Sequence, residues 1–403
     1  MSPASTTSIP LFKPFVSAAS KQRLAATIDA GWLGYGPQCR ELEQRFTERR
    51  GGWALSTSSC TSALFLAGRI VHAATAESTP DCSPEIIVPA ISFVASGMAF
   101  MQAGVRPVVA DVMPKTLLLD PDSVLHSLSP RTRAVLVVHL YGQRHAEMAV
   151  LREICDRRGL LLIEDCAHRV DLLDRDRAAP LGDLTCYSFN AVKELPGGEG
   201  GLIWGRNPRH ENLVRAVSNL GLKVDTMQRS ASLQHADYAF AADIGLKLRN
   251  NDLSAALVNG GIESLAACRK KRAAQCRLYD RLLAPLAPHI VPIERSRDDS
   301  FLMYVVRVAA ELRESIRAAM ASTGVATSVH YPSLARHPVF GNASDDASCL
   351  GQDERVVTLP TYAALGADDQ QRVVDALADA LSAALARPPR AEHVSWPRSS
   401  AAA

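Results

Sequence analysis

LTCYSFNAVKELPGGEGGLIWG, residues 184–205, places a single lysine between two apolar stretches and a glycine-rich loop. The runs 184–189 and 200–205 have the apolar and aromatic composition of buried strands, so Lys193 lies in the short connection between them. Glycines in that connection let the backbone or a flat ligand approach closely. A partly desolvated lysine at a strand end has a lowered pKa and serves as an amine nucleophile that forms Schiff bases; the alternative is a solvated surface lysine.

A carboxylate follows another apolar stretch upstream, LLLIEDCAHRV at 160–170. This pattern predicts a buried strand that ends near Asp165, with His168 just beyond it, and ligands of open α/β sheets bind at the carboxyl ends of strands. Asp165 could simply cap the following segment. Pyridoxal phosphate, however, needs a lysine for its aldehyde and a carboxylate facing its ring nitrogen. Together, Asp165 and Lys193 favour that cofactor.

A phosphate site is expected before the segment LSTSSCTSALFLAGRIV (55–71) turns into a helix near Ser62. A helix N-terminus offers unpaired amides and a positive dipole end to an anion. Thr61 and Ser62 could add hydroxyl groups, and Ser188 could reach the same phosphate; an ordinary helix cap is the alternative. In EIIVPAISFVAS (85–96), Phe93 at a strand exit could stack on a planar ring, or belong to the core.

The order of these motifs resembles that of the DegT/StrS-type sugar aminotransferases, which are pyridoxal-phosphate enzymes of the aspartate-aminotransferase fold (fold type I). The resemblance covers roughly residues 10–385. It rests on GYGPQCRELEQRF (34–46), SSCTSAL (58–64), PAISFVAS (89–96), VHLYGQ (138–143), IEDCAH (163–168), GDLTCYSFNAVKELPGGEGG (182–201) and LRNNDLSAA (248–256).

The resemblance implies a role for each matching residue. Lys193 would form the Schiff base with the cofactor and carry the proton during transfer, and Asp165 would bind the pyridine nitrogen. Phe93 would cover one ring face and His168 would lie on the other. The residues that would hold the phosphate are Thr61, Ser62 and Ser188.

Two departures from the family pattern concern the same end of the cofactor. Cys60 stands where the family has glycine or alanine. The segment GLKLRN (245–250) matches one from which the family sends an asparagine across a dimer interface. Lys247 and Arg249 occupy the two candidate positions, and Lys247 is the one we expect to contact the cofactor.

Strand–helix alternation predicts the architecture. Apolar runs at 85–90, 107–112, 133–140 and 160–165 indicate a mostly parallel sheet covered on both faces, an α/β/α large domain. A long helix at 253–283 that is interrupted by glycines, a strand at 301–309 and helices at 311–324 and 373–385 indicate a smaller α+β domain. The expected division is a flexible N-terminus at 1–10, a cofactor-binding domain at 11–255, a C-terminal domain at 256–386 and a disordered tail at 387–403.

Composition excludes several classes of function. A net charge of +2 over 403 residues argues against nucleic acid or an anionic membrane as the main partner. The basic cluster Arg269–Arg272 is expected to be a solvated helix face. Nine cysteines without a CxxC pair or zinc spacing predict no metal site, and buried reduced thiols typical of the cytoplasm. Neither a signal segment nor an apolar run of bilayer length is found.

The predicted activity is transfer of an amino group from glutamate or glutamine to a nucleotide-linked keto-sugar, in amino-sugar or antibiotic biosynthesis by a homodimer. A keto-cyclitol acceptor and a non-catalytic regulatory protein that binds the cofactor are the alternatives. Retention of Lys193 argues against the dehydratase branch, where histidine replaces it. His330 and Tyr331 match a small-domain segment near the substrate in the family, and a packing role is equally compatible.

Overall fold

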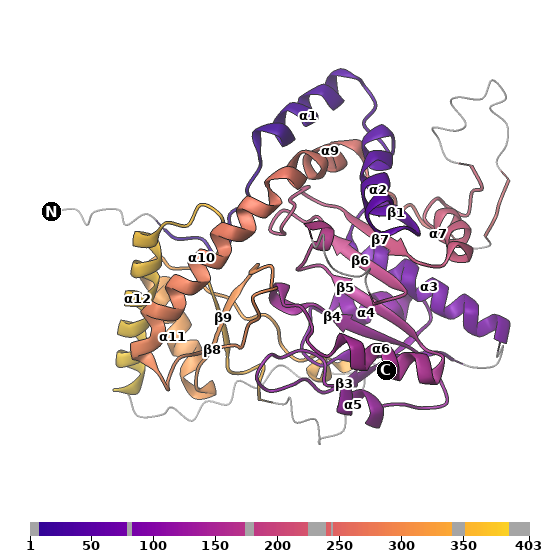
Figure 1. The fold of residues 1–403 in the computed structure, drawn as a ribbon. Coiled ribbons are helices and arrows are strands. Elements are labelled where there is room, and N and C mark those ends of the chain that lie inside the picture. The colour runs from indigo at the N-terminus through magenta and orange to yellow at the C-terminus, as the bar shows by residue number, and fades with distance from the viewer. Residues whose placement is uncertain are drawn as a thin grey trace, which may run out of the picture.

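The computed structural model describes residues 8–78, 83–173, 181–224, 239–242, 245–340 and 351–386. It contains a seven-stranded and a three-stranded sheet joined by long helices (Figure 1). The helices are α1 (Ala18–Asp29), α2 (Pro37–Arg50), α3 (Cys60–Ser78), α4 (Ala95–Gln102), α5 (Pro121–His126), α6 (Met148–Arg158), α7 (Glu211–Val217), α9 (Asp252–Gly261), α10 (Leu265–Leu283), α11 (Ala310–Ser322) and α12 (Ala367–Leu385).

The large sheet has the order β1-β7-β6-β5-β4-β2-β3. All its neighbouring strands run parallel except β7, which is antiparallel to both β1 and β6. This arrangement matches the predicted, mostly parallel sheet, and each predicted strand lies within two residues of an observed one. The strands are β1 (Trp53–Thr57), β2 (Glu85–Pro89), β3 (Arg106–Ala110), β4 (Thr132–Val138), β5 (Leu161–Cys166), β6 (Leu184–Ser188) and β7 (Gly201–Gly205).

Helices cover both faces of this sheet, as the near-continuous apolar strands predicted. Side chains that alternate along the strands separate into two cores. One core packs against α3 and α4, with Leu64 and Phe100 fully buried. The opposite face packs against α2 and α9 at one end and against α5 and α6 at the other.

The antiparallel β6–β7 pair brings the ends of several strands to one edge of the sheet. Gly201 at the start of β7 pairs with Ser188 at the end of β6 and with Thr57 at the end of β1. One strand further along, Asp165 pairs with Cys186. Lys193 lies in the β6–β7 connection and therefore at the same edge, where open α/β sheets bind their ligands.

The three-stranded sheet, β8 (Val291–Pro292), β9 (Tyr304–Arg307) and β10 (Val356–Leu359), is antiparallel and forms the smaller part with α10, α11 and α12. The glycine-interrupted helix expected at 253–283 is divided in two, because a 3-10 turn at Ile262–Ser264, directly after Gly261, separates α9 from α10. Gly260 lies where α1 crosses α9, and a Cβ there would come within 2.4 Å of the Ser20 backbone. Gly260 thus allows the close contact between α1 and α9, in addition to lying near the break between α9 and α10.

Ile9, within the segment expected to be loose, is 2% exposed and forms a bridge with Val325. Residues 1–7 and the expected tail at 387–403 lie outside the described residues. The expected boundary after residue 255 falls within α9, which packs against α1 and α2, whereas α10 packs against α12 (Figure 1). Among the described helices, none is both long enough and apolar enough to cross a bilayer.

Candidate active site

Asp165, on β5, is buried and its carboxylate is held from three sides. Oδ2 accepts a hydrogen bond from Ser96 Oγ at 2.9 Å, and Oδ1 accepts one from the Ala167 amide at 2.9 Å. The Cys60 thiol approaches Oδ1 at 3.8 Å. Burial raises the pKa of Asp165, while the hydrogen bonds from Ala167 and Ser96 and the charge of Lys193 oppose that shift. The carboxylate therefore has a fixed direction and a nearby cation.

Lys193 lies close enough to Asp165 for each side chain to affect the pKa of the other. Its side chain is partly buried, and this burial lowers the pKa of the ammonium group, against the opposing effect of Asp165 and Cys60. A lowered lysine pKa increases the neutral, nucleophilic fraction at a given pH. The loop that holds it is closed by the Lys193 amide, which donates to Asn190 O at 2.9 Å, and by the Ala191 amide, which donates to Gly198 O at 2.8 Å.

His168 is buried beside this pair and its tautomer follows from its contacts. Nδ1 accepts a hydrogen bond from the Tyr141 amide at 3.1 Å, so Nε2 carries the proton of the neutral ring. Nε2 lies 3.2 Å from the Tyr331 hydroxyl. Burial, with Lys193 and His330 contributing, lowers the pKa of His168 well below its usual range. His168 is thus a neutral donor toward Tyr331.

Phe93 and the small-domain pair His330–Tyr331 complete an aromatic cluster at this edge. Phe93 is 53% exposed, and its ring centroid lies 5.5 Å from that of Tyr331. The Tyr331 ring stacks on His168 at 6.0 Å with an interplanar angle of 27°. Burial, and then Lys193, lower the pKa of His330 to about 4. The structure therefore brings His330 and Tyr331 to the site, rather than leaving them in a remote packing role.

The first turn of α3 carries a cluster of serine hydroxyls next to the strand ends. The Ser62 hydroxyl lies 2.9 Å from that of Ser58 and 3.0 Å from that of Ser59. Ser59 Oγ also accepts from the Ser62 amide at 3.1 Å, which is the helix-capping interaction weighed above. Thr61 is exposed at the same turn. Hydroxyls and helix-terminal amides therefore converge on one point, a combination suited to an anion.

Ser188 lies close to this turn because of the strand pairing. It is 6% exposed and pairs with Gly201. A Cβ on Gly201 would lie 2.4 Å from the Ser59 carbonyl carbon, so β7 and the start of α3 are in direct backbone contact. The predicted phosphate residues Thr61, Ser62 and Ser188 are thus gathered, with Cys60 between them and Asp165.

Lys247 and Arg249 differ sharply in their surroundings. Lys247 is exposed, whereas the Arg249 guanidinium lies 4.7 Å from the Tyr35 ring centroid and donates to Arg215 O at 3.1 Å. Between them, Leu248 O accepts a hydrogen bond from the Ser58 amide at 2.7 Å. This segment therefore borders the serine cluster, with Arg249 engaged in its own chain and Lys247 at the surface.

A family model described as the DegT/DnrJ/EryC1/StrS aminotransferase family matches residues 15–378. The chain belongs to this family. The family is pyridoxal-phosphate-dependent, so the expected family, enzyme class and cofactor are confirmed. The donor set fits that cofactor, because an oriented carboxylate, a lysine of lowered pKa and a hydroxyl-rich helix terminus lie along one sheet edge.

Relatives with assigned names support the same conclusion. The chain is 30% identical over 376 residues to a dTDP-4-dehydro-2,3,6-trideoxy-D-glucose 4-aminotransferase from Saccharopolyspora spinosa, covering 91% of this chain and 95% of that protein. It is 28% identical to the aminotransferase TlmJ from Streptoalloteichus hindustanus, with a TM-score of 0.81 and coverages of 93% and 99%. DesI, solved in the presence of its TDP-sugar product, is 27% identical, with a TM-score of 0.77 and 94% of each chain covered. These similarities confirm the predicted fold.

Sequence reasoning missed two residues of this aminotransferase site. Ser96 holds Asp165 and is itself hydrogen-bonded by Ser92 Oγ at 2.8 Å, one helical turn earlier. The i, i+4 spacing of two serines after a strand was the available signal. Tyr141 adopts a positive φ of 62° and donates from its hydroxyl to His330 O, joining the two domains across the site. Its backbone conformation is uncommon for a side chain of this size and left no sequence signal.

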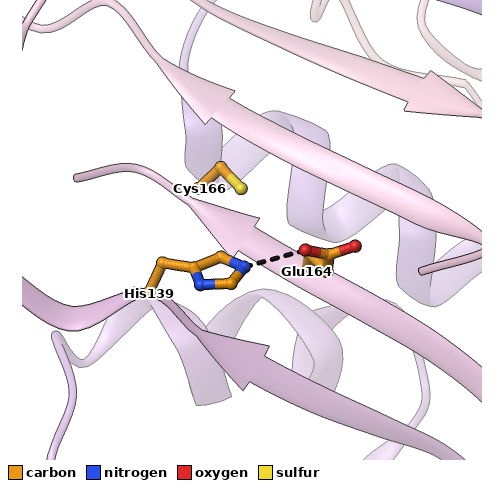
Figure 2. A group of neighbouring side chains, drawn as sticks. All are labelled: His139, Glu164 and Cys166. Atoms are coloured by element: carbon orange, nitrogen blue, oxygen red, sulfur yellow. Dashed lines mark hydrogen bonds and ion pairs between the residues drawn. The ribbon is translucent and has the colours of Figure 1, made fainter. Parts of the chain in front are cut away.

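Behind Asp165, on the other face of β5, His139, Glu164 and Cys166 form a compact buried group (Figure 2). Three ligand types so close together could hold a metal ion, but their polar atoms are already engaged. His139 Nε2 lies 2.8 Å from Glu164 Oε2, and Glu164 Oε1 accepts from the Gly182 amide at 2.7 Å. Burial raises the pKa of Cys166 well above its usual range, which disfavours the thiolate a metal needs. The group is better suited to anchoring β4 to β5 behind Asp165.

Proposed function

We propose that this chain transfers an amino group from glutamate or glutamine to a nucleotide-linked keto-sugar. The observation that carries the proposal is the placement of Asp165, near the end of β5, and Lys193, in the β6–β7 connection, at the same carboxyl edge of the sheet, where each shifts the pKa of the other. The printed activity of the Saccharopolyspora spinosa relative, a 4-aminotransferase of a dTDP-linked sugar, supports the acceptor class. So does the TDP-sugar product present in the DesI structure.

When bound, pyridoxal phosphate supplies an electron sink for the carbon that exchanges the amino group. We assign the protein's contribution to its own side chains. Lys193 Nζ, whose pKa is lowered by burial, would supply the attaching amine and carry the proton in each half-reaction. The Asp165 carboxylate, oriented by Ser96 and the Ala167 amide, would bind the ring nitrogen and favour its protonated form.

The remaining roles concern binding. Thr61, Ser62 and Ser188, with the amides at the start of α3, would hold the phosphate. Phe93 would cover one face of the ring and His168 the other. Burial keeps His168 neutral, so it adds no cation beside the lysine.

We further propose a homodimer in which Lys247 of one subunit reaches the phosphate of the other. Lys247 is exposed and adjoins the serine cluster, whereas Arg249 is held by Tyr35 and Arg215 of its own chain. The seven cysteines of the described part are unpaired and buried, which supports the expected reducing cytoplasm.

Absorption spectroscopy tests the cofactor and the lysine together. Purified protein with pyridoxal phosphate should show a visible band that disappears in Lys193→Ala and persists in Lys270→Ala, an exposed lysine on α10. A wild type without that band would refute the proposed use of Lys193.

The acceptor is tested by mass spectrometry with 15N-labelled glutamate and glutamine. Label should enter nucleotide-linked keto-sugars and should not enter keto-cyclitols. Label found only in a keto-cyclitol would replace the acceptor, and cofactor binding without turnover of either donor would favour a regulatory protein.

A further inference from the structure

Glu194, the residue after Lys193, is the most buried charged group in the lysine loop, with a side chain that is 0% exposed. Its two oxygens are both engaged. Oε1 accepts from Arg269 Nε at 2.7 Å, and Oε2 accepts from Arg269 Nη2 at 2.9 Å, so the ion pair is bidentate. Oε2 also accepts from the Val170 amide at 2.6 Å. Glu194 therefore accepts three hydrogen bonds from two residues, Arg269 and Val170, on two other segments.

These partners come from elements that the site depends on. Arg269 and Arg272 lie on α10, the helix that leads into the small domain, and Arg272 Nη1 is 3.7 Å from Glu194 Oε1. Val170 is two residues after His168, and its carbonyl accepts a hydrogen bond from Arg269 Nη2. The side chains of Arg269 and Arg272 are 13% and 8% exposed, so the expected solvated face is wrong for these two. Lys270 and Lys271 are the exposed members of that cluster.

A network of this kind resists displacement of any one member. A bidentate carboxylate–guanidinium pair fixes direction as well as distance, and removing one partner leaves a buried charge uncompensated. Within the described residues, Arg272 Nε has no hydrogen-bond partner. The Arg272 guanidinium forms its ion pair with the Glu194 carboxylate. The backbone that carries Lys193 is thereby tied to α10 and to the segment after His168.

We propose that Glu194 is a positioning residue: through Arg269 and Val170 it fixes the Lys193 loop, so that the lysine amine keeps its placement toward Asp165 only while α10 is docked. This inference rests on the proposed function of Lys193. It explains why a fully buried carboxylate stands beside a lysine whose pKa is lowered by burial against the opposing effects of Asp165 and Cys60. The charge of Glu194 serves its arginines, and its effect on the lysine is geometric.

The test compares Glu194→Gln and Arg269→Gln with Glu85→Gln. Glu85 is a matched control, because its side chain is 1% exposed and pairs with Arg106 at 2.7 Å and Arg131 at 2.6 Å. It lies at the start of β2, the end of that strand away from the site. Each variant is measured for thermal stability, for the circular dichroism of the bound-cofactor band, and for kcat and KM with the amino donor.

All three variants should lose stability, and only the two in the Glu194 network should change the cofactor dichroism. Those two should lower kcat by up to about 10²-fold with a much smaller change in KM, because a misplaced reacting group slows the chemical step. Glu194→Asp, which keeps the charge, should restore part of kcat. If Glu194→Gln does not fold, Arg269→Gln, on a partly accessible side chain, decides alone.

Unchanged kcat and dichroism relative to Glu85→Gln would overturn the positioning role and leave the proposed function standing. A wild type that lacks the cofactor band would instead overturn the proposed function itself. The two failures are therefore separable in one set of spectra.

Discussion

The Nε2 atom of His168 and the hydroxyl oxygen of Tyr331 lie 3.2 Å apart, although the two residues are contributed by the large and the small domain. Because His168 Nδ1 accepts from the Tyr141 amide, Nε2–H donates to the phenol and leaves the phenol proton available to another acceptor. Burial and Asp165 raise the pKa of Tyr331, so that proton stays on the oxygen. Tyr331 thus offers the site a neutral donor whose direction is set by His168.

Tyr331→Phe is expected to lower kcat/KM by about tenfold, because it leaves the buried His168 donor unpaired and removes the phenol proton from the site. Steady-state kinetics with the amino donor measures the loss. Tyr279→Phe is the control, since the Tyr279 hydroxyl donates to Pro360 O at 2.9 Å in the small-domain core. The control should lose stability and keep its kinetic constants; equal kinetic losses would contradict a specific role for Tyr331.

Gly201→Ala is expected to weaken pyridoxal phosphate binding by about tenfold or more, because a helix-terminal anion site depends on its amides keeping their direction. The new Cβ would lie 2.4 Å from the Ser59 carbonyl carbon and 2.6 Å from the Cys60 amide nitrogen, so the start of α3 must shift. Equilibrium titration of the cofactor band measures the dissociation constant. Gly366→Ala, where a Cβ meets nothing within 4 Å, should bind as the wild type does.

Lys247→Ala is expected to affect cofactor binding, whereas Arg249→Ala is expected to affect the stability of the fold. Lys247→Ala should weaken cofactor binding about tenfold and leave the melting temperature unchanged, because an exposed side chain contributes little to folding. Arg249→Ala should cost about 1–2 kcal/mol of stability through the lost contact with Tyr35 and the lost hydrogen bond to Arg215 O. Cofactor titration and denaturant unfolding of both variants separate the two effects. Weakened binding in Arg249→Ala alone would reverse the assignment.

The sequence was sufficient to place residues that end or follow a predicted strand. Lys193 and Asp165 were predicted to lie at one edge because apolar runs define strands, and parallel strands of an open α/β sheet end at a common edge. Partners from distant segments were not accessible in this way. Arg272 lies on the same buried stripe of α10 as Cys268 and Cys276, so periodicity could have placed it inward. Its partner Glu194 is far away in the sequence, and only the fold identifies it.

The same limit applies to the partners of Ser96, Tyr141 and Tyr331. Each of these three residues acts through the direction of one side chain toward a residue on another element, which depends on how α4 packs and on how the small domain docks. Gly260 was informative in part. Its position in a helix predicted an interruption, but its contact with Ser20 of α1 could be identified only from the fold.

Acid should destabilise the protein through His145, and His145→Gln should remove part of that sensitivity. His145 is 1% exposed; its Nε2 donates to Leu119 O at 2.8 Å and its Nδ1 accepts from the Glu147 amide at 3.2 Å. Protonation at Nδ1 would place its N–H against the N–H of Glu147, so that two donors face each other. Burial lowers the pKa of His145 to about 4. Between pH 6.5 and pH 4 the unfolded chain binds a proton that the folded chain does not, so stability falls as the pH falls, by up to about 3 kcal/mol.

The measurement is the free energy of unfolding in denaturant at pH 7, 6, 5 and 4. The advantage of wild type over His145→Gln should shrink steadily across this range, whereas His126→Gln, at an exposed position on α5, should follow the wild-type curve. Other acidic groups titrate in the same window, and the difference between variants cancels their contribution because they are common to all three proteins. A wild-type advantage that stays constant from pH 7 to pH 4 would show that His145 takes up its proton equally in the folded and the unfolded chain.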